Sequence, residues 1–371
     1  MIKMSKDKLN KNFPCDSKNA YQASKDKYKN IDTMRSVVKN CFKFNQDLEI
    51  LNYISSGSCG IVYEGKIRKS PNKKVALKFI LNKILETKNE KIRNNEKEKE
   101  KLHNRIISKE TSIQNKLKHK NITTLYGVYE LENYSSCIVM ELAKYGDLDY
   151  FQKKLIHKQH LSETLLAYIT KQILNGLYYC HQSKIIHMDI KHQNILIDEN
   201  LQIKLADLSV SYSYANFPPG SQVPLPLAGT SLFMSPEVLG KKEIFSEDCN
   251  KIDMYSLGSL LYNLAFGEYP YNLDLSDKKN FKKIKEKISK NELSIPLNKR
   301  YSQLFRNFIS RLLHKNIKMR LSIDQAMNHP WIKGANLIFW EKEKIFDLEK
   351  FLVNLVTDTI KPFNDFLHSR C

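Results

Sequence analysis

A short run of polar residues near the middle of the chain has the residue types that acid–base and metal chemistry require. Within eight residues it holds a histidine, a carboxylate, a lysine and an amide, which are His187, Asp189, Lys191 and Asn194. A carboxylate can take up a proton, a lysine can neutralise negative charge, and an amide oxygen suits a hard cation. At ordinary residue frequencies these types at these offsets would recur by chance in only a few of about a thousand such chains. The run is therefore a candidate catalytic centre.

Further polar features lie at the ends of predicted strands. Asp207 comes thirteen residues after Asn194 and follows the strand predicted over 201–205, so a second carboxylate lies at a loop entrance after a β-hairpin. Upstream, the Gly-rich run Gly57-Ser-Cys-Gly60 separates two predicted strands. Lys78 lies on the strand after them, in the run Val-Ala-Leu-Lys.

The elements that must position these residues divide into a β-rich part and a mainly helical part. Apolar runs predict strands over 48–54, 61–63, 75–80, 124–129, 137–140 and 195–197. A helical pattern with Ile106, Ile113 and Leu117 on one face precedes the fourth of them. Ser162 is the predicted N-cap of an amphipathic helix over 165–179, and further helices are predicted over 251–265, 301–313 and 322–328.

In this order, the motifs resemble those of the eukaryotic protein kinase family over residues 46–332. The Gly-rich turn alone would be weak support, but these motifs together, at compatible spacings, are specific. The resemblance implies an α+β, bilobal protein-kinase-like fold. A small antiparallel β lobe with one main helix would span 46–143, with a charged insertion at 81–105, and a larger, mostly helical lobe would span 144–332.

The resemblance implies transfer of the γ-phosphate of ATP, a reaction in which positioning and charge neutralisation dominate. Asp189 would orient the substrate hydroxyl and accept its proton, and Lys191 would steady the γ-phosphate during transfer. Asp207 and Asn194 would be ligands of Mg²⁺, for which Mn²⁺ could substitute.

The resemblance also implies an ATP site. Lys78 would contact the α- and β-phosphates, and an ion pair with Glu110 would fix its position. Small residues in the Gly-rich run would let its backbone approach the phosphates. Apolar residues would enclose the adenine, and the stretch 141–143 would bond to its edge. Besides Lys78 and Asp207, the nucleotide-binding residues are expected to be Ile54, Gly57, Gly60, Val62, Ala76, Met140, Glu141, Ala143, Asp147 and Leu196.

The resemblance is to the serine/threonine type, so the expected partners are ATP and proteins with serine or threonine acceptors. Lys191 two residues after Asp189 is typical of that type, in which the hydroxyl of Thr230 would bridge the two. Gln193 stands where kinases that prefer basic substrates often have glutamate, so a strong preference of that kind is not indicated.

Two structural contacts follow from the same resemblance. Glu237, in the run Ser-Pro-Glu, would form a buried ion pair with Arg320. Asp253 would accept hydrogen bonds from the backbone of the catalytic loop.

The chain departs from the family pattern at four positions: Ser55, Gln114, Met188 and Ser209. Family members that are switched on by activation-loop phosphorylation have an arginine in place of Met188, and a methionine cannot receive a phosphate. We therefore expect activity without phosphorylation of Ser211, Ser213 or Ser221. The polar Gln114 is expected to weaken the docking of its helix, and Ser209 to restrict the backbone after Asp207.

The four departures also support an alternative, a catalytically weak or inactive pseudokinase that acts as a scaffold. The chain nevertheless has Lys78, Glu110, Asp189, Asn194 and Asp207 together. A scaffold has no physical need of both metal ligands and the base, so the active enzyme is the leading hypothesis.

The chain has 371 residues, with 60 Lys and Arg against 40 Asp and Glu, a net charge of +20. Its 42% hydrophobic residues exclude a wholly disordered chain. Half of the excess charge lies in residues 1–45 (+7) and 81–105 (+3). Residues 1–45 are expected to be a disordered basic arm, with nucleic-acid or membrane binding as an alternative. Residues 333–371 are expected to be an apolar-charged tail, either packed on the large lobe or inhibitory.

Seven widely spread cysteines without a CxxC pair disfavour a disulfide framework or a zinc site. The first residues lack the apolar core of a signal peptide, and no apolar run reaches the ~18 residues of a membrane span. A soluble, intracellular protein is therefore expected, in the cytoplasm with the nucleus as an alternative. A monomer is also expected.

Overall fold

The computed structural model describes residues 26–56, 60–81, 96–132, 135–151, 161–200, 202–297 and 300–339. The chain divides into two units. The first comprises the residues up to Lys109 together with Leu125–Leu142, and the second comprises Glu110–Thr124 and the residues from Ala143 onward. An antiparallel sheet dominates the first and helices dominate the second, which confirms the expected α+β class.

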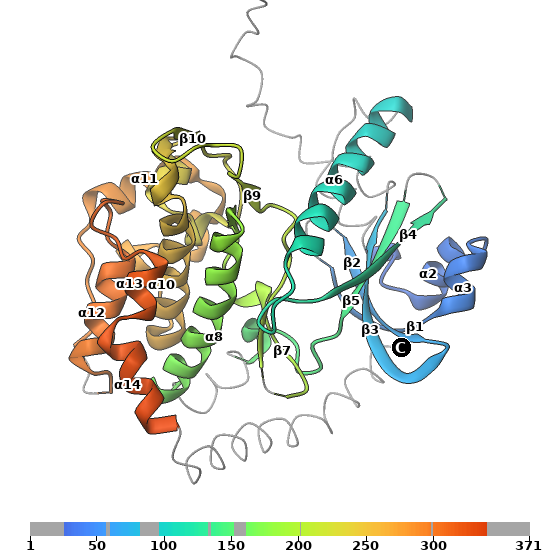
Figure 1. The fold of residues 1–371 in the computed structure, drawn as a ribbon, viewed down its shortest axis with the longest axis horizontal. Helices are drawn as coiled ribbons and strands as arrows, with labels where there is room; N and C mark the ends of the chain where they lie inside the picture. The colour runs from blue at the N-terminus through green and yellow to red at the C-terminus, as the bar shows by residue number, and fades with distance from the viewer. Residues whose placement is uncertain are drawn as a thin grey trace, which may run out of the picture. The chain divides into compact units, whose positions relative to one another are not determined.

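The first unit contains a five-stranded antiparallel sheet in the order β1-β2-β3-β5-β4 (Figure 1). Its strands are β1 (Leu48–Ser56), β2 (Ile61–Ile67), β3 (Ser70–Ile80), β4 (Leu125–Leu131) and β5 (Ser135–Glu141). All five strands that the apolar pattern predicted for this part of the chain are therefore confirmed, with bounds that differ from the predicted ones by up to five residues.

The two faces of the sheet differ in what they contact. On β3, Val75, Leu77 and Phe79 belong to one buried cluster, and Ile80 belongs to a second cluster with Ile138 of β5. Because side chains alternate across a strand, Ala76 and Lys78 lie on the same face as Ile80. The face with Lys78 is therefore distinct from the main apolar core of this unit.

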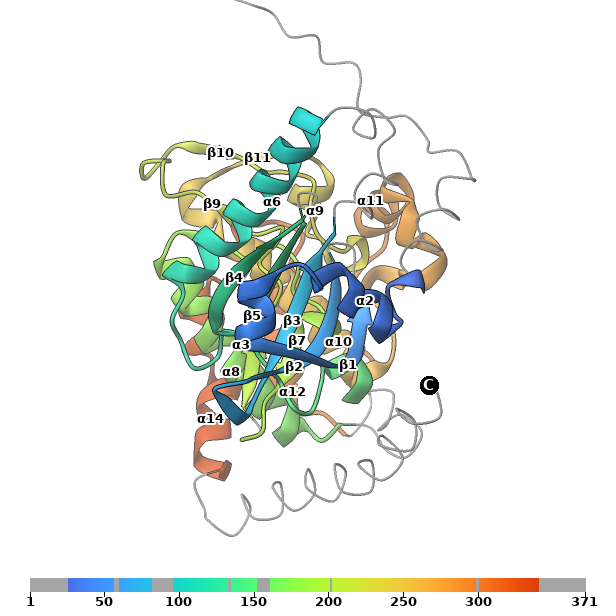
Figure 2. The same ribbon diagram turned by 90° about the vertical axis from the view of Figure 1, so that its right-hand side faces the viewer.

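Two short helices, α2 (Ile31–Val38) and α3 (Phe42–Asp47), cover the face with Phe79. Figure 2 shows both beside β1. Asn30 caps α2 by accepting hydrogen bonds from the backbone N–H groups of Asp32 and Thr33. The buried side chains of Met34, Val38 and Phe44 join the sheet's core.

The expectation of a disordered arm is therefore wrong for residues 26–45, whereas residues 1–25 lie outside the described residues. The physical reason is the tertiary core: each short helix has few apolar residues, but together they cover apolar side chains of the sheet. Burial of these side chains offsets the cost of ordering the backbone.

Helix α6 (Glu96–Lys116) lies between β3 and β4 in the sequence. Its first part includes residues 96–105 of the predicted insertion, and residues 82–95 lie outside the described residues. In the first unit, Nε2 of the buried His103 ring lies 2.8 Å from Ser136 Oγ of β5. Burial lowers the pKa of this histidine. Ile107 of the same helix packs against the cluster of Ile80 and Ile138.

The second unit is mainly helical. Its helices are α8 (Glu163–Gln182), α9 (Pro236–Leu239), α10 (Asn250–Phe266), α11 (Phe281–Lys290), α12 (Gln303–Leu312), α13 (Ile323–Met327) and α14 (Pro330–Phe339). Its short strands are β6 (Ile185–Ile186), β7 (Ile195–Ile197), β8 (Ile203–Leu205), β9 (Tyr212–Ser213), β10 (Gln222–Pro224) and β11 (Glu243–Phe245). Its 3₁₀ turns are η1 (His192–Asn194), η2 (Ser231–Phe233), η3 (Ser246–Asp248), η4 (Pro270–Asn272) and η5 (Leu275–Lys279).

The predicted helices of this unit are confirmed. Ser162 caps α8, accepting a hydrogen bond from the Leu165 N–H at 3.2 Å. Helix α10 is buried along most of its length, packs against α8 and α12, and ends at Gly267 with a φ of 75° (Figure 1). Among the described helices, none is both long and apolar enough to cross a bilayer.

The predicted tail boundary at residue 333 falls inside α14. Trp331, near the start of that helix, is buried and donates its indole N–H to Glu163 Oε1 at 2.9 Å. The first residues of the predicted tail, 333–339, therefore belong to the helical unit, and residues 340–371 lie outside the described residues.

Candidate active site

A β-hairpin brings two of the predicted metal ligands together. Strands β7 and β8 pair with Ile195 opposite Leu205, so Asn194 and Ala206 meet at the open end of the hairpin. The Ala206 N–H donates to the Asn194 carbonyl at 2.9 Å. Asp207 comes next, half-buried and with a φ of 60°, a left-handed conformation that few non-glycine residues adopt. The site therefore holds strained backbone at one predicted ligand.

The carboxylate of Asp189 is the centre of a polar cluster. Lys191 Nζ lies 2.5 Å from its Oδ2, and the Thr230 hydroxyl donates to its Oδ1 at 2.7 Å. Lys191 also donates to Thr230 Oγ1 at 2.9 Å, so the predicted bridge by Thr230 is confirmed. Asn194 donates through Nδ2 to the Asp189 carbonyl at 2.8 Å and to Oδ2 at 2.9 Å. These contacts fix the carboxylate in one orientation.

Asp253 of α10 holds the backbone of the catalytic loop, as predicted. Its carboxylate is fully buried and accepts the N–H groups of His187 at 2.8 Å and Met188 at 2.9 Å. Sequence reasoning missed His181, whose Nε2 lies 2.7 Å from Asp253 Oδ2. A buried histidine in the last turn of an apolar helix was the available signal.

Gly229 makes a close approach that only glycine permits. A Cβ atom at this position would lie 2.2 Å from the carbonyl oxygen of Met188, and the φ of Gly229 is 105°. The segment that carries Thr230 is thereby packed directly on the catalytic loop. Met188 has a φ of 69°, and its side chain, 4% exposed, belongs to the apolar core.

The segment between Asp207 and Glu237 is held by backbone pairing. Strand β9 pairs with β6, and β10 pairs with β11. Gly220 N–H donates to Glu247 Oε1 at 2.5 Å, and Ser246 N–H donates to the Ser221 carbonyl at 3.0 Å. The Ser211 hydroxyl is buried and donates to the Leu208 carbonyl at 2.6 Å.

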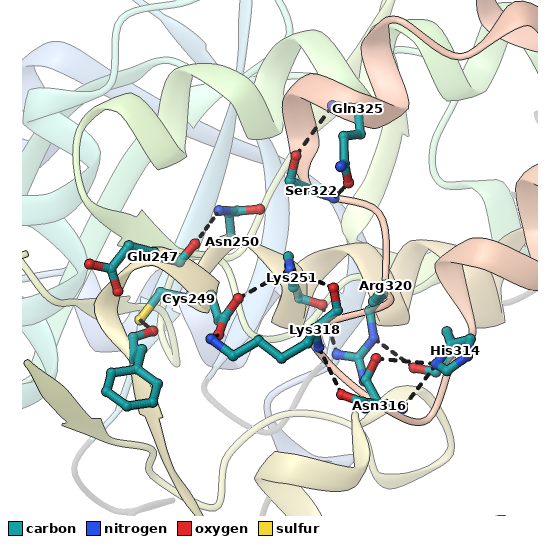
Figure 3. A network of polar contacts seen from close by, with 12 residues as sticks. Glu247, Cys249, Asn250, Lys251, His314, Asn316, Lys318, Arg320, Ser322 and Gln325 are labelled. Atoms are coloured by element: carbon teal, nitrogen blue, oxygen red, sulfur yellow. Dashed lines mark hydrogen bonds and ion pairs between the residues drawn. The ribbon is translucent and has the colours of Figure 1, made fainter. Parts of the chain in front are cut away.

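The predicted ion pair of Glu237 and Arg320 is confirmed. Two guanidinium nitrogens lie 3.1 Å from the two carboxylate oxygens, and both side chains are buried. Figure 3 shows Arg320 between Lys251 and His314, whose carbonyl oxygens it also contacts, each at 3.0 Å. Arg320 therefore ties the start of α9 to α10 and to the loop before α13.

In the first unit, one sheet face carries the predicted nucleotide residues. Val62 on β2 and Lys78 on β3 are register partners, and Ala76 is the partner of Met140 on β5. Lys78 is largely buried. A Cβ atom on Gly60 would lie 2.5 Å from the Phe79 carbonyl, so packing against β3 also requires glycine there.

The remaining nucleotide residues lie on both units. Ile54 is 44% exposed at the end of β1, and Glu141 ends β5; Gly57 lies outside the described residues. In the second unit, Asp147 and Leu196 form an isolated bridge, and Asp147 Oδ1 accepts the Tyr150 N–H at 2.9 Å. Ala143, also in this unit, is half-buried in the loop before that bridge.

Two departures from the family pattern fit the structure without strain. Gln114 is buried, yet its Nε2 donates to the Thr123 carbonyl at 3.0 Å, and Thr123 donates to the Leu205 carbonyl. The buried amide of Gln114 is thus hydrogen-bonded, and the weaker docking of this helix stays a prediction. Ser209 lies in a turn and its φ is not positive, so the position does not require glycine.

Glu110, 1% exposed, lies at the start of the part of α6 that belongs to the second unit.

The family model for the protein kinase domain matches residues 48–332. The chain belongs to the protein kinase family. It is 28% identical over 321 residues to a probable serine/threonine-protein kinase, MARK-A, of Dictyostelium discoideum, covering 86% of this chain and 26% of that protein. It is 34% identical to CBL-interacting serine/threonine-protein kinase 14 of Arabidopsis thaliana, over 61% of this chain and 48% of that protein.

A third similar protein is death-associated protein kinase 2 of Mus musculus, which is 32% identical over 66% of this chain and 64% of that protein. The chain therefore spans between about a quarter and two thirds of the length of these three relatives.

Proposed function

We propose that the chain is an active protein kinase that transfers the γ-phosphate of ATP to serine or threonine hydroxyls of proteins. The observation that carries this proposal is the cluster around Asp189, where Lys191, Asn194 and Thr230 all contact one carboxylate. An acceptor hydroxyl oriented by Asp189 would give up its proton to that carboxylate as the phosphoryl group is transferred. Lys191 would neutralise the charge that develops on the phosphoryl oxygens.

The residues at the hairpin fit a Mg²⁺ ion that accompanies the nucleotide. Both hydrogen bonds of the Asn194 side chain use Nδ2, so its amide oxygen is the atom that would face a cation. Asp207 supplies a carboxylate two residues beyond the end of β8, and such a small set of oxygen ligands is usual for Mg²⁺ held together with phosphates. The bound ion would neutralise phosphate charge. Lys78 and Glu110 as a pair, and Asp147 at the ribose, complete the proposed ATP site.

The proposed kinase does not depend on phosphorylation of its activation segment. The segment is held by the pairing of β9 with β6 and of β10 with β11, that is, by backbone groups of the protein itself. Met188 packs in the apolar core and has no charge with which to receive a phosphate. Ser211 is buried, which makes it a poor substrate for another kinase.

The proposed activity is tested with a Ser/Thr peptide library and labelled ATP, with wild type beside Asp189→Asn. We expect Mg²⁺-dependent transfer by wild type that falls to background in the variant, which keeps the side chain's shape but loses the base. No transfer by wild type with either Mg²⁺ or Mn²⁺ would favour the pseudokinase scaffold. A cytoplasmic location and a monomeric state are part of the proposal.

Independence of phosphorylation is tested separately. Wild type treated with phosphatase, and a variant with alanine at Ser211, Ser213 and Ser221, are both expected to keep their activity. Loss of activity in both would show that phosphorylation of this segment is required.

A further inference from the structure

The second unit has a strongly basic surface on η5 and α11. Residues 275–290 contain seven lysines and only two acidic residues. Six of the lysines are exposed. We call five of them, all but Lys283, the basic face: Lys278, Lys279, Lys282, Lys285 and Lys290. Within the described residues, none of the five forms an ion pair.

The other two lysines of this run have an internal role. Lys283 and Lys287 each lie 2.7 Å from the carboxylate of Asp277, which is fully buried. Lys287 also donates to the Asn272 carbonyl at 2.8 Å. These contacts fix η5 against α11 and use the charge of Asp277. The five lysines of the basic face therefore share the run with one other acidic residue, Glu286.

A short chain of contacts links the basic face to the catalytic carboxylate. Thr230 contacts Asp189, and the next residue, Ser231, donates its hydroxyl to the Lys278 carbonyl at 2.6 Å. All of these residues belong to the second unit, and η2, which begins at Ser231, packs against both η5 and α11. A polypeptide whose acceptor hydroxyl lies at Asp189 would therefore place the residues on either side of that hydroxyl close to the basic face.

We propose that the basic face binds acidic residues that flank the acceptor hydroxyl of a protein substrate, a proposal that rests on the proposed kinase activity. Charge complementarity selects Asp, Glu or an already phosphorylated residue at this place. The contacts from Asp189 through Thr230 and Ser231 to Lys278 place the basic face next to the catalytic carboxylate. A polypeptide substrate is therefore favoured over other anions. Exposed Leu275 and Phe281 lie in the same run, so an anionic membrane is the competing partner to be tested.

The test uses two peptides that differ only in their flanking residues, which are Asp and Glu in one and Asn and Gln in the other. Wild type is compared with the variant Lys278→Glu, Lys279→Glu and Lys282→Glu. The matched control is Lys241→Glu, Lys242→Glu and Lys333→Glu, three exposed lysines of the same unit with the same change in net charge. The thermal midpoint of each variant checks that it is folded.

For wild type and the control we expect kcat/KM for the acidic peptide to exceed that for the neutral one about tenfold, since two or three exposed charge pairs would contribute. The ratio should fall close to one in the basic-face variant. It should also fall for wild type as salt is raised. A ratio near one in wild type, or an unchanged ratio in the basic-face variant, would overturn the proposal.

Binding of a fluorescent acidic peptide is measured in parallel, so that failure of this proposal and failure of the kinase activity can be told apart. If no peptide is phosphorylated, binding lost only in the basic-face variant still supports the acidic partner, and unchanged binding overturns it. If that variant loses binding to anionic phosphatidylserine vesicles or to RNA but keeps peptide binding, the basic face serves another anion and the proposal is wrong.

Discussion

At the residue scale, the Asp189 carboxylate is oriented by three neighbours from two parts of the chain. Lys191 and Asn194 come from the catalytic loop, whereas Thr230 comes from about forty residues further on. Gly229 lets that distant segment approach because a side chain there would overlap the Met188 carbonyl. The orientation of the base therefore depends on tertiary packing as well as on the local motif.

Replacement of the Thr230 hydroxyl tests this directly. Thr230→Ala removes hydrogen bonds to two charged groups and should lower kcat by about 10- to 100-fold, with little change in KM for ATP. Thr230→Ser keeps the hydroxyl and should retain most of the activity. Steady-state kinetics at saturating ATP measure both, and equal loss in the two variants would show that the methyl group, not the hydroxyl, matters.

Met188 allows a second test at this scale. Met188→Arg restores the residue type that the resemblance leads one to expect, but places a charge in an apolar core and should lower the free energy of unfolding by about 3 kcal/mol. The control, Met188→Leu, conserves volume and should cost under about 1.5 kcal/mol. Denaturant unfolding gives both values; an equally stable arginine variant would mean that the site can open to solvent.

At the element scale, α2 and α3 are an addition to the sheet that residue patterns did not reveal. Phe44→Ala should lower the free energy of unfolding by about 3 to 5 kcal/mol, because it leaves a cavity against Phe79 and Tyr129. Lys43→Ala, a neighbour with an exposed side chain, is the matched control and should change little. Similar small effects for both would show that α3 does not contribute to the stability of the sheet.

The junction of η5 and α11 has a defined pH dependence. Burial alone would raise the pKa of Asp277, but hydrogen bonds from Lys283 and Lys287 outweigh it, so this pKa lies below its usual value. The hydrogen bond to Asp277 in turn raises the pKa of Lys287. Because folding lowers the pKa of the Asp277 carboxyl group, its charge stabilises the folded state above the unfolded pKa of about 3.9. This stabilisation is lost as the pH falls through the pKa of the folded state.

Asp277→Asn should therefore lower the free energy of unfolding by about 2 kcal/mol at neutral pH. The difference from wild type should be constant from about pH 5 to pH 9 and should shrink below about pH 4, where the wild-type carboxylate takes up a proton. Thermal midpoints across this range measure it. A difference that persists unchanged at pH 2 would mean that side-chain packing, not charge, is what the substitution removes.

At the scale of the whole molecule, the sequence predicted best those features whose residues lie close together along the chain. The hairpin that joins Asn194 to Asp207 and the alternation along β3 follow from short apolar periods, so both could be predicted. The contact of His181 with Asp253 joins residues 72 positions apart and leaves no periodic signal. Likewise, the partner of Gln114 is a backbone carbonyl that only the folded chain brings within reach.

The composition located half of the excess positive charge in residues 1–45 and 81–105, but the structure shows a further concentration of lysines elsewhere. Part of the excess in residues 26–45 lies on helices that pack on the sheet. The concentrated positive surface lies instead on η5 and α11, close to the segment that contacts Asp189. Under the proposal above, the charge of the basic face bears on substrate choice, and nucleic-acid or membrane binding by residues 1–45 stays an untested alternative.

We propose above all that this member of the kinase family is active without a phosphate on its activation segment. The most direct measurement is the initial rate of phosphate transfer from Mg-ATP to a Ser/Thr peptide library by phosphatase-treated wild type, beside Asp189→Asn. We expect the treated wild type to retain its full rate and the variant to fall to background. A rate no higher than that of Asp189→Asn would contradict this proposal.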